Sequence, residues 1–174
     1  GLPIQVVRTY DSRDARVGDF GAGWRLDVRQ GSLRHNRPPG AAWRVAGGFL
    51  PCQAAQEMRP HVTTVRLSDR ELYRFRPVLY GLVPTQGGCF GEVRYELVEG
   101  PLPGTRLEIL GNSRVFWGNG SDAVLDVDRF VPWTPDAVRL VTRAGRSVEL
   151  ASTVGVTKLS DAHGNALTIG EGGI

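Results

Sequence analysis

The sequence has little of several features that would assign it to a common class. No stretch approaches the roughly 20 apolar residues that a membrane-spanning helix needs. No long stretch has the apolar spacing of an amphipathic helix, whereas 23 glycines and 11 prolines interrupt the chain. We therefore expect no membrane span and an all-β fold of short strands and turns.

Lysine and net charge are also scarce. Lys158 is the only lysine, and 21 basic against 18 acidic residues leave a net charge of +3. A strong arginine bias is typical of a GC-rich genome. Arginines such as Arg74 and Arg94 alternate with acidic residues through strand-like segments, which favours solvated strand faces with cross-strand ion pairs over a phosphate-binding stripe. We expect no nucleic-acid partner.

Cysteine and histidine are too few and too scattered for a metal site. Cys52 and Cys89 fit no zinc spacing, and His35, His61 and His163 each lack a partner at ligand spacing. A disulfide between the cysteines is possible, but two separate buried thiols are the commoner outcome in a chain of this size. We expect free thiols, no metal and no cofactor.

The opening stretch, residues 1–24, has the most distinctive pattern. Apolar residues alternate from Leu2 to Val6, which predicts a strand, and a polar turn follows. The stretch ends on Phe20-Gly21-Ala22-Gly23-Trp24. Glycines on both sides of Ala22 predict positive φ or close backbone approach, with Phe20 and Trp24 as large apolar anchors. We expect Trp24 to be largely buried.

Both ends of the chain resemble bacterial RHS (YD-repeat) proteins. The opening match is carried by Gly1-Leu2-Pro3, Arg8-Thr9-Tyr10, Ser12, Gly18, Phe20-Gly21 and Gly23-Trp24-Arg25-Leu26. The closing match, Gly155 to Thr168, is similar to one repeat unit of strand, Asp-x-x-Gly turn and strand. Its motif residues are Asp161, Gly164 and Asn165, and Ser160 stands where the repeat has tyrosine.

This resemblance implies a fold and a function. RHS shells are long, spiralling antiparallel β-sheets that close around a C-terminal domain, commonly a toxin. The chain would then be a structural wall segment at the start of the repeat core of a polymorphic toxin or related protein. Its partners would be the remaining repeats, the enclosed domain and a delivery apparatus, and the parent protein would be secreted, surface-exposed or delivered. The acidic self-cleavage motif of some members is absent, so no catalytic residue is carried over.

The length of 174 residues suits one domain, which we divide into three parts. Residues 1–33 are the opening strands and corner, residues 34–60 an irregular connection in which only 54–58 favours a helical turn, and residues 61–174 a β-meander. The chain begins at Gly1 without a secretion signal, so we expect a piece of a longer protein. Strands are expected over 24–33, 62–67, 72–79, 90–98, 105–110, 114–117, 123–127, 137–142, 146–151, 154–159 and 166–169.

Two details of the meander can be tested against a structure. Pro77 predicts that its strand ends there or runs along a sheet edge, and residues 81–88 are expected to form a loop. In a segment cut from a shell, the apolar inner face would lack its cover, and the segment alone would self-associate. That face comprises Val62, Leu67, Phe75, Val93, Tyr95 and Leu97.

Candidate chemistry is sparse, and no enzyme is expected. Asp11, Asp14 and Asp19 could serve a glycosidase or a cation, but interspersed arginines favour ion pairs in a polar loop. Asp126 and Asp128 lack the glycine and glutamate of a calcium loop and are interpreted as turn and surface residues. No serine elbow or phosphate-binding glycine loop is present.

The aromatic residues leave a second hypothesis open. They could form a carbohydrate-stacking platform, although core positions on inner strand faces are favoured. A stand-alone β-sandwich or barrel that binds carbohydrate or another surface ligand is the alternative to the shell segment. These aromatic residues are Trp24, Trp43, Trp117, Trp133, Tyr73, Tyr80 and Tyr95.

Overall fold

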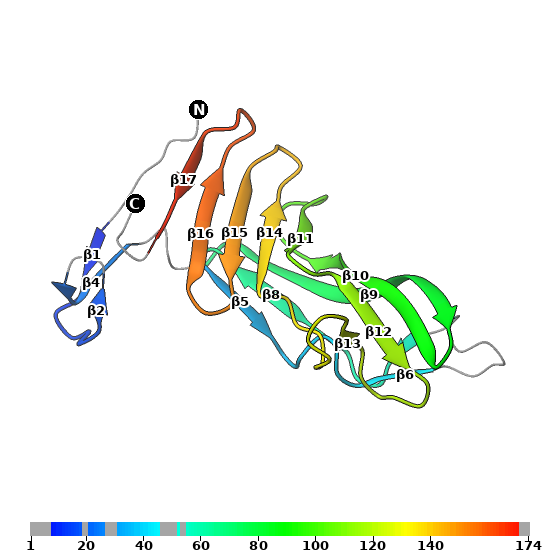
Figure 1. The fold of residues 1–174 in the computed structure, drawn as a ribbon. Coiled ribbons are helices and arrows are strands. Elements are labelled where there is room, and N and C mark those ends of the chain that lie inside the picture. Colours follow the sequence, from blue (N-terminus) through cyan, green and yellow to red (C-terminus); the bar gives the residue numbers. More distant parts are fainter. Residues whose placement is uncertain (1–7, 19–20, 27–30, 46–51, 53–54, 171–174) are drawn as a thin grey trace.

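The computed structural model describes the chain except residues 1–7, 19–20, 27–30, 46–51, 53–54 and 171–174 (Figure 1). The described residues form strands and turns without a helix, which confirms the all-β prediction. The strands are β1 (Arg8–Tyr10), β2 (Val17–Gly18), β3 (Gly21–Ala22), β4 (Trp24–Leu26), β5 (Ser32–His35), β6 (Trp43–Val45), β7 (Ala55–Glu57), β8 (Thr63–Arg66), β9 (Leu72–Thr85), β10 (Gly88–Glu99), β11 (Arg106–Leu110), β12 (Arg114–Gly118), β13 (Leu125–Asp126), β14 (Ala137–Val141), β15 (Ser147–Ala151), β16 (Gly155–Ser160) and β17 (Ala166–Thr168).

Two larger antiparallel sheets carry the fold. The hairpin sheet has six strands in the order β13-β12-β10-β9-β8-β5 and is built around the long β9–β10 hairpin. The meander sheet has five strands in the order β11-β14-β15-β16-β17. Pairs β1–β4, β2–β3 and β6–β7 form separate two-stranded sheets. The predicted antiparallel meander is confirmed over β14 to β17, where each strand pairs with its neighbour in sequence.

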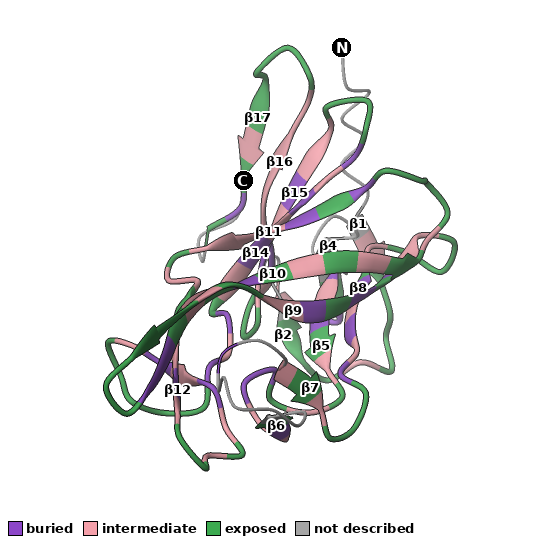
Figure 2. Cartoon of the chain, turned by 90° about the vertical axis from the view of Figure 1, so that its right-hand side faces the viewer, coloured by how far each residue is buried: buried purple, intermediate pink, exposed green. Residues whose placement is uncertain are grey.

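The first core cluster, here the meander-side core, combines side chains from both larger sheets. Period-two alternation directs these residues inward, as the bands of buried and exposed residues along β8 and β9 show (Figure 2). Most of them have aliphatic side chains. The members are Leu33, Val65, Tyr73, Phe75, Leu107, Val138, Leu140, Val148, Leu150, Val156 and Ile169.

The second cluster, here called the tryptophan core, includes residues of β10 and β12 in the hairpin sheet. Its members are Trp43, Val93, Val115, Trp117, Val124 and Trp133. Gly40 is clamped here, because its N–H donates to the Trp133 carbonyl at 2.8 Å while its own carbonyl accepts from Val124 N–H at 2.6 Å. A Cβ on Gly40 would lie 2.3 Å from the Trp133 nitrogen, so only glycine fits without backbone movement.

The expected inner face is covered within the chain, which corrects the expectation of an open face. Phe75 is fully buried and Val93 is buried, while Tyr95 and Leu97 are half-buried. The meander sheet packs against one part of this face, and Trp43 from the 34–60 segment packs against another. Because this face is covered, it no longer gives a reason to expect self-association of the isolated chain.

The long hairpin differs from its predicted outline. Residues 81–85 continue β9, so the predicted loop over 81–88 is wrong, and the turn is confined to Gln86 and Gly87. A register shift opposite Gly91, with Gly81 at φ +62°, bends the strand without ending it. Pro77 lies where β9 has passed the end of β8 and pairs with β10 alone, which confirms the predicted edge position.

The 34–60 segment is more ordered than expected. Ala55–Glu57 is strand β7, paired with Trp43–Val45, so the predicted helical turn over 54–58 is wrong. The segment also makes an antiparallel bridge between Ala41 and Ala123. Pairing with β6 in the same segment overrides the local helical preference of this alanine-rich stretch.

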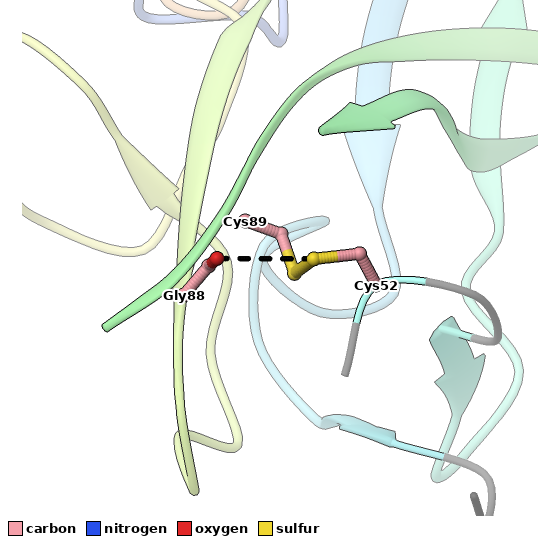
Figure 3. Close-up of a disulfide and its surroundings, with 3 residues drawn as sticks. All are labelled: Cys52, Gly88 and Cys89. Atoms are coloured by element: carbon pink, nitrogen blue, oxygen red, sulfur yellow. Dashed lines mark hydrogen bonds between the residues drawn. A yellow bond between two sulfur atoms is a disulfide. The ribbon is translucent and has the colours of Figure 1, made fainter. Parts of the chain in front are cut away.

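Cys52 and Cys89 form a disulfide, which contradicts the expected free thiols (Figure 3). Cys52 lies in the connection between β6 and β7, and Cys89 lies near the start of β10 opposite Trp117. Both side chains are buried. The expectation failed because residues 37 positions apart are brought together only by the folding of the 34–60 segment onto the hairpin sheet.

Candidate functional site

The opening corner is built as the glycine pattern predicts. Arg8 and Tyr10 in β1 pair with Leu26 and Trp24 in β4. Gly23 has φ +78°, and a Cβ there would lie 2.6 Å from the Asp11 carbonyl oxygen. Asp11 N–H donates to the Gly23 carbonyl at 2.8 Å, so the two segments are in direct contact. The close approach and positive φ predicted for this corner are confirmed.

Trp24 does not fill the predicted buried position. Its exposed fraction is 36%, and its ring packs at 5.1 Å from the ring of Tyr10, which is 56% exposed. Neither Trp24 nor Tyr10 belongs to either core cluster. Gly21 also has positive φ, +104°, as expected, while Phe20 falls outside the described residues.

The carboxylates of the opening turn serve local contacts. Asp14 binds the Arg16 guanidinium at 2.8 Å, and Asp11 Oδ1 accepts the Arg13 N–H at 2.9 Å. The hydrogen bonds that the Arg16 guanidinium donates to Asp14 are the main reason that the pKa of Arg16 is raised. Both pairings agree with the predicted polar loop, and Asp19 lies outside the described residues.

The closing turn is organised by Asp161. Its Oδ1 accepts the N–H groups of His163 and Asn165, both at 2.9 Å, and its Oδ2 accepts the Asn165 side-chain amide at 2.8 Å. Gly164 takes φ +86°. The carboxylate thus holds closed the Asp-x-x-Gly turn that the resemblance implied between β16 and β17.

The histidines do not gather into a ligand set. His163 is exposed in the turn, whereas His35 and His61 lie on the buried side of the hairpin sheet. No group of three or more potential metal ligands occurs in the part of the chain that the structure describes.

His35 belongs to a buried polar chain. Its Nδ1 lies 2.9 Å from the Thr63 hydroxyl, which lies 3.3 Å from the Tyr95 hydroxyl. Burial lowers the pKa of His35 from 6.5 to about 4 and raises the pKa of Tyr95. Because charging His35 is disfavoured in the folded state, its contribution to stability decreases as the pH falls from 6.5 towards 4.

Most of the aromatic residues are core, as predicted. Tyr73, Trp43, Trp117 and Trp133 are buried, and Tyr95 packs against Trp133 at 6.4 Å between ring centres. The exposed exceptions are Trp24 and Tyr80. The Arg94 guanidinium lies 3.8 Å from the Tyr80 ring centre, so that ring face is already occupied.

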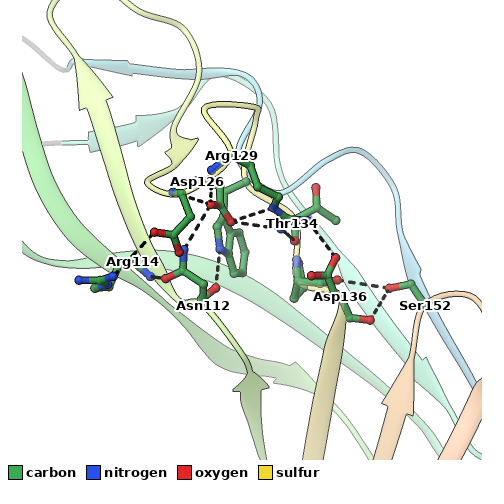
Figure 4. A network of polar contacts seen from close by, with 10 residues as sticks. Asn112, Arg114, Asp126, Arg129, Thr134, Asp136 and Ser152 are labelled. Atoms are coloured by element: carbon green, nitrogen blue, oxygen red, sulfur yellow. Dashed lines mark hydrogen bonds and ion pairs between the residues drawn. The ribbon is translucent and has the colours of Figure 1, made fainter.

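A buried carboxylate network was missed by the sequence analysis. Asp126 is only 1% exposed, which contradicts its interpretation as a surface residue. It accepts the N–H groups of Asp128 and Arg129 at 2.9 and 3.0 Å, the Asn112 amide and the Arg129 guanidinium (Figure 4). Burial would raise the pKa of Asp126, but these hydrogen bonds and the guanidinium outweigh it and lower the pKa.

This network positions the turn that leads into Trp133. Arg129 also reaches Asp136 at 3.2 Å, which links the turn to the start of β14. Phe130 is held at φ +55° with its side chain 70% exposed. The alternation of Asp-x-Asp followed by Arg is a turn signal in the sequence, but burial of the first carboxylate depends on the packing of Trp133 beside it.

Two shallow cavities lie on the hairpin sheet. One, of about 390 Å³, lies between β7 and β9 and includes Trp43, Glu57 and Arg76 in its lining. The other, of about 360 Å³, lies near the tip of the β9–β10 hairpin and includes Val83, Phe90 and Arg114.

Comparison with known proteins assigns no function to these features. No protein-family model, curated protein or solved structure matches the chain. Within the described ranges, no helix is long and apolar enough to cross a membrane.

Proposed function

We propose that the chain is a structural wall segment at the start of an RHS (YD-repeat) shell that encloses a C-terminal domain, commonly a toxin. The sequence resemblance of the two ends supports this proposal. So does the structure of each end, because the glycine corner and the Asp161 turn both form the tight hairpins that such motifs require. In this role the chain supplies sheet surface rather than chemistry.

The observation that carries the proposal is the outer edge of β17. Among the described strands, β17 is the last in the order β11-β14-β15-β16-β17, so a strand added beyond it would continue the meander. Ile169 N–H donates to Thr157 and Asn165 accepts from Asp161, so odd-numbered residues face β16. Alternation then directs the backbone groups of Ala166 and Thr168 outward, where a further strand would bind.

The test compares the chain alone with the longer protein that continues beyond Ile174. We expect the amide of Thr168 to exchange rapidly in the chain alone. In the longer protein it should be protected at least a hundredfold by the added strand. Equal exchange in the two proteins would contradict the shell proposal.

A matched pair of variants isolates the edge. In the longer protein, Thr168→Pro removes an outward N–H without removing a hydrogen bond to β16, and it should leave the enclosed domain open to protease, because the sheet cannot continue. Thr168→Val retains the N–H and should behave as the unmodified protein. Identical protease resistance of the two variants would show that no further strands assemble on the outer edge of β17.

A second function is favoured by the covered core. Because the sheets pack on each other within one chain, the molecule satisfies the requirement for a stand-alone ligand-binding β-sandwich. That function predicts a clean monomer with a cooperative melt, unchanged by downstream sequence. Light scattering and thermal melts on the same two proteins distinguish the two functions.

A further inference from the structure

His61 presents both ring nitrogens to oxygen acceptors. The residue is 3% exposed, and it lies between β7 and β8. Its Nε2 lies 2.6 Å from the Ala41 carbonyl oxygen, and its Nδ1 lies 3.3 Å from Glu57 Oε1. The ring stacks on the Trp43 indole at 5.3 Å and 13° between planes. The imidazole is therefore held in one orientation.

A neutral ring that faces an ionised Glu57 cannot satisfy both contacts. A carbonyl oxygen only accepts, so Nε2 must carry the hydrogen that binds Ala41. In the neutral ring, Nδ1 would then direct its lone pair at a carboxylate oxygen. Neither His61 Nδ1 nor Glu57 Oε1 has another hydrogen-bond partner among the described residues. Buried polar atoms are seldom left in that state.

We propose that His61 and Glu57 form a proton-dependent latch for the 34–60 segment. A proton on Nδ1 makes the ring an imidazolium that donates to Ala41 through Nε2 and faces the Glu57 carboxylate through Nδ1. The latch joins β7 to the start of β8 and to the backbone beside Trp43. It thereby ties the end of the segment to Ala41, near its beginning.

The surroundings favour this charge distribution. Arg76, on β9, lines the same 390 Å³ cavity as Glu57, and the two side chains interact electrostatically. Among the described residues that line this cavity, Glu57 and Arg76 carry the charged side chains, and the Ala41 carbonyl and Trp43 ring contribute only dipole and ring charge. The indole face also favours a stacked cation.

Protons can reach the latch through the cavity. The Glu57 side chain, which lines it, is 26% exposed, whereas the His61 side chain is 1% exposed. As the pH rises, loss of the Nδ1 proton removes a charge-assisted contact and leaves a lone pair facing a carboxylate. The latch therefore stabilises the segment at low pH and releases it as the pH rises.

Nitrogen-15 NMR of the imidazole rings tests the protonation state directly. We expect the doubly protonated signature for His61 at pH 6 and its loss on titration to pH 9. His163, exposed in its turn, and His35, whose pKa burial lowers to about 4, serve as internal references. A neutral Nε2–H tautomer of His61 at pH 6 would overturn the proposal.

Hydrogen exchange tests whether the proton controls the segment. After correction for intrinsic rates, protection of the β6 amides should fall about tenfold between pH 6 and pH 8.5. Glu57→Gln should abolish this dependence, and Glu108→Gln, an exposed control on β11, should retain it. The same pH dependence in Glu57→Gln as in the unmodified chain would show that Glu57 and His61 are not coupled.

Discussion

The meander strands and the tryptophan core differ in how far apart in the sequence their parts lie. In the meander sheet, strands β14, β15 and β16 are joined by short turns, and each pairs with the next along the chain. The tryptophan core instead brings Trp43 together with Trp117 and Trp133, across about half of the chain. The first depends on local alternation and the second on long-range closure.

The polar contacts of the two regions differ in the same way. On the outer face of the meander sheet, Arg139 pairs with Glu108 and Glu149 at 3.7 and 2.9 Å, as cross-strand alternation predicts. Around the tryptophan core, the disulfide joins residues 37 positions apart, and the buried Asp126 carboxylate accepts the Asn112 amide from 14 positions away. The long-range contacts of this region therefore include a covalent bond and a buried carboxylate.

Trp133→Ala should have the largest effect, because it empties the centre of the tryptophan core. Trp133 is fully buried, and its indole N–H donates to the Asn112 carbonyl at 2.9 Å. We expect a loss of about 3–5 kcal/mol in the free energy of unfolding, measured by urea denaturation. Hydrogen exchange should show a greater loss of protection in β6 than in β15. Equal losses in both strands would show that the two cores form one cooperative unit.

Removing the disulfide should rank next. Cys52→Ser with Cys89→Ser releases a loop whose ends are 37 residues apart, which costs about 3–4 kcal/mol in the chain-entropy model. Calorimetry on the oxidised chain and on this double variant measures the loss. Thiol counting under denaturing, non-reducing conditions should find none in the unmodified chain. A count of two free thiols would show that the bridge is absent, and the disulfide would then not distinguish the two regions.

Asp126→Asn should have an intermediate effect, since it removes the charge that accepts two backbone amides and a guanidinium. We expect a loss of about 2 kcal/mol at pH 7. Because the pKa of Asp126 is lowered in the folded state, the difference should shrink as the pH falls below the usual 3.8. Asp128→Asn is the matched control, because Asp128 is exposed and pairs with Arg114 at the surface. This variant should change stability by less than about 0.5 kcal/mol.

Trp24→Ala should have the smallest effect. Full burial would have implied a loss like that of Trp133→Ala, but at 36% exposure only the contact with Tyr10 and partial burial are lost. We expect about 1 kcal/mol by thermal denaturation. A loss above about 3 kcal/mol would mean that the corner is buried by another part of the protein in solution.

The sequence by itself determined the elements whose signals are local. Alternation and turn residues placed β14 to β17, Gly23 restricted the corner, and Asp161 closed its own hairpin. These features were predictable because each depends on backbone conformation or hydrogen bonds within a few residues.

Only the tertiary structure decided the contacts that cross the chain. The burial of Asp126, the exposure of Trp24, the disulfide and the opposed acceptors of His61 all depend on which distant segment packs against each residue. A side chain's type gives its preference for burial, but the free energy depends on the partner that folding supplies. For that reason the meander could be predicted from the sequence, and the packing of the 34–60 segment onto the hairpin sheet could not.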